Sequence, residues 1–185
     1  MGKVQGEIQD THKAFISRQK MFFVSTAPLS DEGHINLSPK GIDCFRVLSP
    51  TRVAYMDITG SGNETSAHIL ENGRITIMFC AFEGPPNILR LYGKGHAILP
   101  TSKEWLQLSS LFELHLSTRQ IIVIDIHRVS SSCGFGVPFY EYKGERDQAD
   151  KWAIQKGPEG LEKYRQEKNL VSIDGLPTAL SQNVE

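Results

Sequence analysis

Short apolar stretches with alternating polar positions run along the first 130 residues, which is the pattern of β-strands. Residues 21–27 are rich in strand-forming side chains, and residues 34–40 follow after a polar turn that contains a glycine. Ile35 and Leu37 share one face of the second stretch, because side chains alternate along a strand. The other face of this stretch is polar, with Asn36, Ser38 and Lys40. The two stretches predict a β-hairpin with one polar face.

Four further stretches predict strands, at residues 52–58, 74–82, 88–99 and 119–129. Helical patterns lie between the strands, at residues 10–19, 63–72 and 101–112. Residues 145–168 predict two polar helices that are broken at the Gly-Pro pair of residues 157–158. Six strands with mostly short connections predict a mainly β fold. We expect an antiparallel barrel, closed or half-closed, with peripheral helices.

The composition is that of an ordinary globular protein, with 39% hydrophobic and 22% charged residues. A net charge of −1 offers no basic surface for nucleic acid or an anionic membrane, and no apolar run approaches a membrane span. Residues 1–20 are polar and do not resemble a secretory signal. We therefore expect a single cytoplasmic domain, residues 1–185, that binds neither nucleic acid nor a membrane.

The three cysteines and six histidines are scattered along the chain. Cys44, Cys80 and Cys133 lie far apart and form no CxxC pair, which favours reduced thiols over a disulfide framework. The histidines show no HxxxH spacing, so we expect no metal site. Cys133 lies in a glycine-rich loop, where an inert thiol is favoured over a nucleophile.

A glycine-broken turn, Gly60-Ser61-Gly62, opens the predicted helix at residues 63–72. The start of a helix offers free backbone N–H groups and a positive dipole end, and both favour phosphate. Lys40, at the end of a predicted strand, would supply the full positive charge. Together these features indicate a cofactor or substrate that carries a phosphate.

The same turn also has a purely structural interpretation. Ser61 and Glu64 stand at the S-x-x-E spacing of a capping box. In that arrangement the Glu64 carboxylate would occupy donors that a phosphate needs, and it would repel the anion. Lys40 could likewise be a solvated surface lysine. Asp57 could serve acid–base chemistry, but strand-end hydrogen bonding is the favoured role. Two arginines, Arg74 and Arg90, are further candidates for a phosphate contact or a partner-chain contact.

Several segments together resemble the pyridoxamine 5′-phosphate oxidase family, the FMN-binding split barrels. They are the hairpin ending in Lys40-Gly41, the strand ending in Thr59, the turn and short helix ending in Glu71-Asn72, the apolar strand at residues 75–82, and Arg90-Leu91-Tyr92-Gly93-Lys94-Gly95. Within the family, Ser38-Pro39-Lys40-Gly41, the turn at residues 60–65 and the loop at residues 132–138 resemble an uncharacterised branch. The resemblance covers residues 10–130.

The resemblance implies a six-stranded antiparallel split β-barrel core at residues 10–130 and a C-terminal helical extension at residues 139–185. It implies a flavin-dependent oxidoreductase that acts on a small-molecule substrate and binds FMN at the interface of a homodimer. No catalytic residue is indicated. The implied FMN-binding residues are Asn36, Ser38, Lys40, Thr59, Ser61, Gly62, Asn63, Glu64 and Thr65.

The chain departs from the true oxidases at several positions that the family uses for phosphate. Lys40 matches the family lysine, but Ile35 stands in place of an arginine. A Ser-Arg-Lys triplet is replaced by Asn63, Glu64 and Thr65. These losses leave two alternatives open: a flavin-binding or interaction barrel without catalysis, and a deazaflavin-dependent reductase of the same fold.

Overall fold

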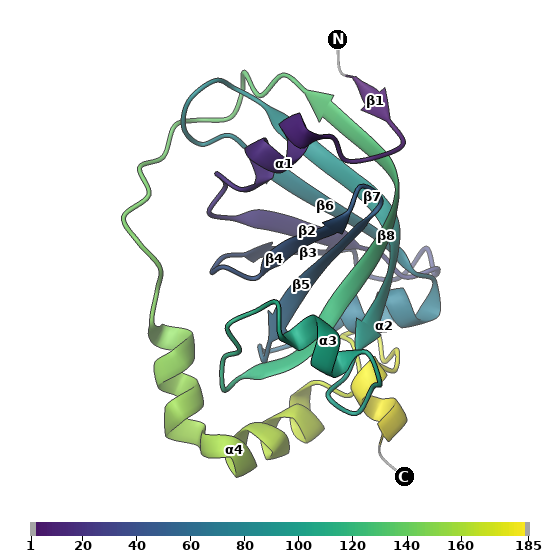
Figure 1. The fold of residues 1–185 in the computed structure, drawn as a ribbon. Coiled ribbons are helices and arrows are strands. Elements are labelled where there is room, and N and C mark those ends of the chain that lie inside the picture. Colours follow the sequence, from purple (N-terminus) through teal and green to yellow (C-terminus); the bar gives the residue numbers. More distant parts are fainter. Residues whose placement is uncertain (1–2, 184–185) are drawn as a thin grey trace.

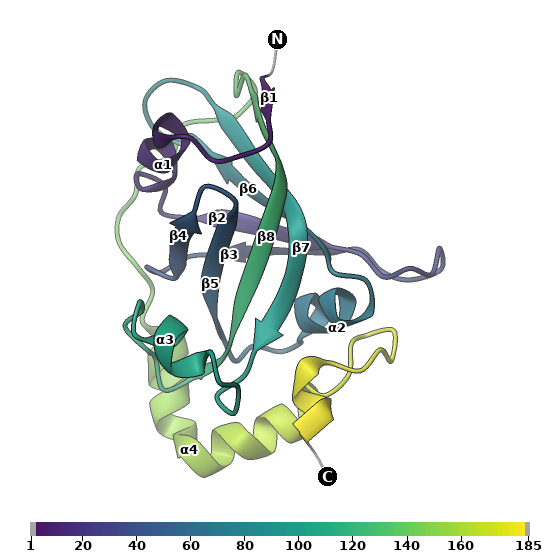
Figure 2. The ribbon, with the colours of Figure 1, turned by 45° about the vertical axis from the view of Figure 1, so that its right-hand side comes forward.

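The computed structural model describes residues 3–183, which form one curled antiparallel sheet with helices at its ends (Figures 1 and 2). The strand order is β3-β2-β6-β7-β8-β5-β4, and β1 pairs with β8. In chain order, the elements are β1 (Val4–Gln5), α1 (Asp10–Ile16), β2 (Phe22–Thr26), β3 (Asn36–Lys40), β4 (Phe45–Ser49), β5 (Arg52–Ile58), α2 (Glu64–Glu71), β6 (Arg74–Cys80), β7 (Ile88–Ile98), α3 (Trp105–Ser109), β8 (Thr118–Ser132), α4 (Gln148–Lys168) and a 3₁₀ helix (Ala179–Asn183).

All six predicted strands are confirmed, as β2, β3, β5, β6, β7 and β8. The count of six is wrong, because the sheet has eight strands over residues 3–183. The additional strands, β1 and β4, are short. All five residues of β4 are partly buried, so the strand lacks the alternation of buried and exposed positions that a period of two would reveal. The mainly β barrel with peripheral helices is confirmed.

Aromatic side chains fill the barrel interior where the two ends of the strand path approach each other. The Phe45 ring of β4 lies 5.1 Å from the Phe22 ring of β2 and 5.1 Å from the Phe79 ring of β6. Tyr55 of β5 lies 5.6 Å from Phe22 and is fully buried. These contacts curl the sheet, since they join strands that are distant along the path.

The longest pairing, between β7 and β8, contains a bend at a glycine of β7. The register shifts between Tyr92 and Gly93. A Cβ atom at Gly93 would lie 2.4 Å from the carbonyl oxygen of Asp125, so only glycine allows this approach. The bend turns the two long strands around the barrel.

The C-terminal helix lies against the lower end of the barrel in the view of Figure 1. Gly157, with φ of 65° and ψ of 172°, interrupts α4, which confirms the predicted break between two helices. Leu161 and Asn169 are buried against the barrel, so the C-terminal segment reaches the turn that precedes α2. Within residues 3–183, no helix has both the length and the apolar character that a membrane span requires.

Candidate functional site

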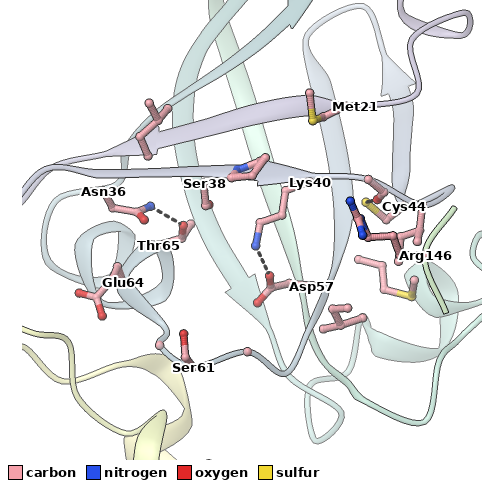
Figure 3. A pocket seen from close by; sticks show the side chains of 18 of the residues that line it. Met21, Asn36, Ser38, Lys40, Cys44, Asp57, Ser61, Glu64, Thr65 and Arg146 are labelled. Atoms are coloured by element: carbon pink, nitrogen blue, oxygen red, sulfur yellow. Dashed lines mark hydrogen bonds and ion pairs between the residues drawn. The ribbon is translucent and has the colours of Figure 1, made fainter. Parts of the chain in front are cut away.

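A cleft of about 1530 Å³ lies between β3, the end of β5, the start of α2 and two C-terminal segments (Figure 3). This volume exceeds the roughly 300–1,000 Å³ of most ligand pockets. The C-terminal segments are residues 140–146 and residues 167–173. All nine residues that the family resemblance implies for a cofactor line this cleft: Asn36, Ser38, Lys40, Thr59, Ser61, Gly62, Asn63, Glu64 and Thr65.

The inner face of β3 is polar, as its alternation predicts. The Asn36 side-chain amide donates to the hydroxyl of Thr65 at 3.0 Å. Lys40 Nζ donates to Asp57 Oδ1 at 3.0 Å, and the lysine side chain stays 23% exposed. Ser38 lies between them and points into the cleft; its hydroxyl is buried and has no partner within residues 3–183. Ile35 is exposed on the opposite face.

Asp57 is the buried centre of the site. Arg119 Nε and Gln120 Nε2 each donate to Asp57 Oδ2 at 2.8 Å, and Lys40 bonds the other oxygen, so two cations share one carboxylate. Burial would raise the pKa of Asp57, but the charges of Arg119 and Lys40 and the bond from Gln120 outweigh it and hold the pKa well below its usual range. The carboxylate is therefore ionised at neutral pH, and the group of three charges is net positive.

The turn before α2 is held through its carbonyl groups. Arg119 Nη1 donates to the carbonyl oxygen of Gly62 at 2.9 Å and to Asn169 Oδ1 at 2.8 Å. The Asn169 amide donates to the carbonyl oxygen of Gly60 at 3.0 Å. Asn63 accepts from Gln120 at 2.8 Å. Within the described part of the chain, no backbone N–H of residues 60–64 donates to another residue, so the donors of the turn stay available.

The capping box predicted from Ser61 and Glu64 does not form. Asn63 is the N-cap residue of α2, and no side chain caps the helix. Glu64 Oε2 instead accepts from the backbone N–H of Ile173 at 3.0 Å. The reason is tertiary: the C-terminal loop offers the carboxylate a donor that the local sequence does not show. The backbone donors of the helix start are therefore not used by the Glu64 carboxylate, although Glu64 Oε1 lies 3.0 Å from the position that a Cβ atom on Gly62 would take.

Two of the nine residues hold the cleft together through their side chains. The Thr59 hydroxyl donates to the carbonyl oxygen of Ser117 at 2.8 Å and accepts from Arg165 Nε at 2.9 Å. The Asn63 amide donates to the carbonyl oxygen of Asn169 at 3.2 Å. Both side chains are buried, so they position the turn and leave ligand contacts to Ser38, Lys40 and the backbone.

Arg119 and Asn169 are site residues that the sequence did not reveal. In the sequence, Arg119 shows only as a polar residue at the edge of an apolar strand, and Asn169 only as a polar residue after a long helix. The two arginines that were candidates lie elsewhere: Arg74 donates to Pro28 and Asn72, and Arg90 donates to the Ser132 hydroxyl at 3.1 Å. Neither lines the cleft.

The thiol of Cys44 and the carboxylate of Asp57, both in the cleft, are held in unreactive forms. Burial raises the pKa of Cys44, which lines the cleft, to about 12, so this thiol stays protonated at neutral pH. Asp57 is fixed in its ionised form by its partners. Among residues 3–183, no three His, Cys, Asp or Glu side chains are grouped so that they could hold a metal ion. The arrangement can bind and orient an anion. His34 is the one imidazole that lines the cleft among the described residues, and its hydrogen bond to Asp174 raises its pKa.

Comparison with known proteins identifies the family. The family model described as pyridoxamine 5′-phosphate oxidase matches residues 8–133. The pyridoxamine 5′-phosphate oxidase family protein ustO of Aspergillus flavus is 39% identical over 190 residues, which cover 92% of this chain and 75% of that protein.

Solved structures show the same fold at low identity. HupZ from Group A Streptococcus has a TM-score of 0.52 at 20% identity, covering 66% of this chain and 91% of that chain. A candidate pyridoxamine 5′-phosphate oxidase from Lactobacillus delbrueckii has a TM-score of 0.52 at 11% identity, covering 68% of this chain and 94% of that chain. The match to the family model and the 39% identity to ustO together assign the sequence to a family. This chain belongs to the pyridoxamine 5′-phosphate oxidase family.

Proposed function

We propose that this chain binds FMN in the cleft and acts as a flavin-dependent oxidoreductase on a small molecule. The observation that carries the proposal is the charge group at the end of β3. Lys40 and Arg119 share the single carboxylate of Asp57, which leaves one positive charge uncompensated in a largely buried place. An anion at this position would neutralise the remaining positive charge, because a buried charge without a counter-ion costs free energy.

The residues present fit the phosphate of a flavin mononucleotide. The buried hydroxyl of Ser38 has no partner in the described chain and faces the cleft. The backbone N–H groups of the Gly60–Thr65 turn are unengaged up to residue 64, at the positive end of the α2 dipole. The proposed phosphate ligands are therefore Ser38, Lys40 and the turn, with Arg119 and Asn169 holding the turn from behind.

The flavin would supply the electron transfer, and the protein would supply binding and orientation. The cleft volume of about 1530 Å³ leaves room for a small substrate beside the cofactor. Because Asp57 stays ionised and Cys44 stays protonated, neither group is poised for acid–base work. The protonation states of Asp57 and Cys44 therefore also fit a second candidate function, a flavin carrier without catalysis. Reduction of bound flavin by NADH or NADPH would distinguish an enzyme from a carrier.

Titration with FMN tests the proposal. Quenching of flavin fluorescence should give a dissociation constant in the micromolar range or tighter, about −8 kcal/mol of binding free energy. Riboflavin lacks the phosphate and should bind more weakly, because it cannot meet Lys40 or the turn. Equal affinities for FMN and riboflavin would contradict the proposed phosphate site.

The proposal includes a homodimer. The outer face of the β3-β2-β6-β7 part of the sheet carries apolar side chains that are not fully buried, among them Phe23, Leu37, Met78 and Tyr92. Leu37 is 64% exposed, and a surface of this kind is typical of a two-fold interface. All three cysteines are unpaired, which supports a reducing compartment such as the cytoplasm.

Light scattering should give twice the 20.7 kDa mass of one chain at micromolar concentration with FMN present. Leu37→Lys should shift the protein toward the monomer, because a charge would be buried at the interface. A monomeric wild-type protein under these conditions would contradict the dimer.

A further inference from the structure

The end of the cleft opposite the α2 turn is built by a coil outside the residues that match the family model. That match ends at residue 133, whereas residues 140–146 line the cleft. We infer that Arg146, which this coil carries, binds an anionic group of the substrate, a carboxylate or a phosphate. The inference rests on the proposed function, since it names the substrate class of the same cleft.

Three hydrogen bonds attach the coil to the barrel. The backbone N–H of Tyr140 donates to the carbonyl oxygen of Phe82 at 3.0 Å. The backbone N–H of Tyr142 donates to Glu83 Oε1 at 3.3 Å, and the backbone N–H of Ile42 donates to Glu145 Oε2 at 3.2 Å. In Figure 1 the coil runs from β8 to α4 along the open side of the barrel. It therefore has a defined place as one wall of the cleft.

The attachment point is a strained residue. Ile42 has φ of 57°, in the left-handed region that a β-branched side chain rarely adopts. It follows directly on Lys40 and Gly41, and it lines the cleft. Such outliers persist where the surrounding structure fixes them, and they concentrate at functional sites. The strained residue Ile42 thus lies between Lys40, at the proposed phosphate site, and the coil of residues 140–146.

The carboxylates of this wall already have partners. Glu145 Oε1 accepts from the Tyr142 hydroxyl at 2.7 Å, and its other oxygen accepts from Ile42. Glu141 lies 3.9 Å from Lys143 Nζ. Glu83 accepts from Tyr142. Glu83 and Glu145 are therefore directed at the protein, which reduces their capacity to neutralise a neighbouring cation, whereas Glu141 and Lys143 form an exposed pair.

Three cations at this end of the cleft have no ion-pair partner among the described residues, whereas Lys143 is paired with Glu141. Within residues 3–183, Arg18, Lys20 and Arg146 line the cleft and form no ion pair. Lys20 Nζ instead lies 5.5 Å from the centre of the Tyr142 ring. Figure 3 shows the Arg146 side chain extending into the cleft near Cys44, with its guanidinium directed toward the Lys40 side. Arg146 is thus an exposed cation that faces the cleft and has no ion-pair partner among the described residues.

The chemistry of the wall sets the substrate class. A guanidinium offers a planar pair of donors that matches a carboxylate or a phosphate in two-point geometry. Met21, Ile42 and Met56 line the same region and suit an apolar body. The expected substrate is a small molecule with an apolar part and one anionic group.

Isothermal titration of the full chain with three probes tests the inference, both with FMN bound and without flavin. The probes are phenyl phosphate, benzoate and neutral benzamide, which share a ring and differ in charge. At least one of the two anions should bind more tightly than benzamide. Arg146→Gln should weaken binding of the anions roughly ten- to hundredfold and leave the affinities for benzamide and FMN within about twofold. Arg146→Lys should recover part of the loss.

A matched control is Lys103→Gln, which removes one exposed cation outside the cleft and should change nothing. Amide chemical shifts should move at residues 140–146 when phenyl phosphate binds. Failure of both anions to bind, equal affinities for the anions and for benzamide, unchanged anion affinity in Arg146→Gln, or shifts confined to residues 60–65 would each overturn the inference. If wild-type protein binds no FMN, the proposed function fails, while the titrations without flavin still decide the role of Arg146.

Discussion

Asp57→Asn should lower the free energy of unfolding by about 3–5 kcal/mol, more than any other single change in the cleft that we consider. The substitution keeps the shape of the side chain and removes the charge that balances Lys40 and Arg119. Arg119 is 5% exposed, so its charge would remain buried without a counter-ion. For a chain of this length the midpoint of thermal unfolding should fall by roughly 6–20 °C. Calorimetry of the flavin-free protein measures both quantities.

The pH dependence of this effect has a definite sign. Because the pKa of Asp57 is held below its usual range, the folded protein binds this proton less readily than the unfolded chain. The stabilisation is complete above the unfolded pKa of about 3.9 and is lost as the pH falls below it. The difference in stability between wild type and Asp57→Asn should stay constant from pH 8 to about pH 5 and shrink below about pH 4.

Asp125→Asn is the matched control for Asp57→Asn. Asp125 lies on β8, its side chain is 64% exposed, and its distance from Arg52 is 3.5 Å. An exposed pair of this kind contributes about 0–1 kcal/mol. If the two substitutions cost the same, or if the Asp57→Asn difference changes between pH 6 and pH 8, the buried charge group does not have the energetic role described here.

Lys40→Met should weaken FMN binding roughly ten- to hundredfold. A charge-assisted contact to a phosphate contributes about 1.5–3 kcal/mol, and each 1.4 kcal/mol is a factor of ten. Methionine keeps a flexible apolar stem of similar length, so the change removes mainly the charge. Fluorescence titration with FMN measures the dissociation constants of the two proteins.

The same substitution should also cost stability, because Lys40 is paired with the buried Asp57. The cost should be smaller than for Asp57→Asn, since Arg119 and Gln120 still bond the carboxylate. Arg90→Met is the control for a lost cation: Arg90 donates to Ser132 outside the cleft, so its removal should leave FMN affinity within about twofold. A large loss of affinity in Arg90→Met would mean that charge anywhere on the protein affects binding.

The sequence predicted the parts of the fold that depend on local patterns. The alternation in residues 34–40 placed Asn36, Ser38 and Lys40 on one face, because a strand has a side-chain period of two. The break in α4 followed from Gly157 and Pro158, whose backbone preferences are local. The strand β4 was missed, because half-buried strands at an edge do not alternate clearly.

The rest of the site depends on contacts between distant segments. Asn169 meets Gly60 and Arg119 meets Asp57 only after the barrel closes and the C-terminal segment packs beneath it. The predicted capping box failed for the same reason, since Ile173 offers Glu64 a donor from far along the chain. No local pattern marks residues 140–146 as a wall of the cleft either. Tertiary packing decided these features.

The central claim is that the Lys40 end of the cleft holds the phosphate of FMN. Four titrations test it most directly: wild type and Lys40→Met, each with FMN and with riboflavin. We predict that the substitution weakens FMN roughly ten- to hundredfold and riboflavin by less than about twofold, because only FMN carries the group that Lys40 meets. Equal losses for both flavins, or no loss for FMN, would contradict the claim.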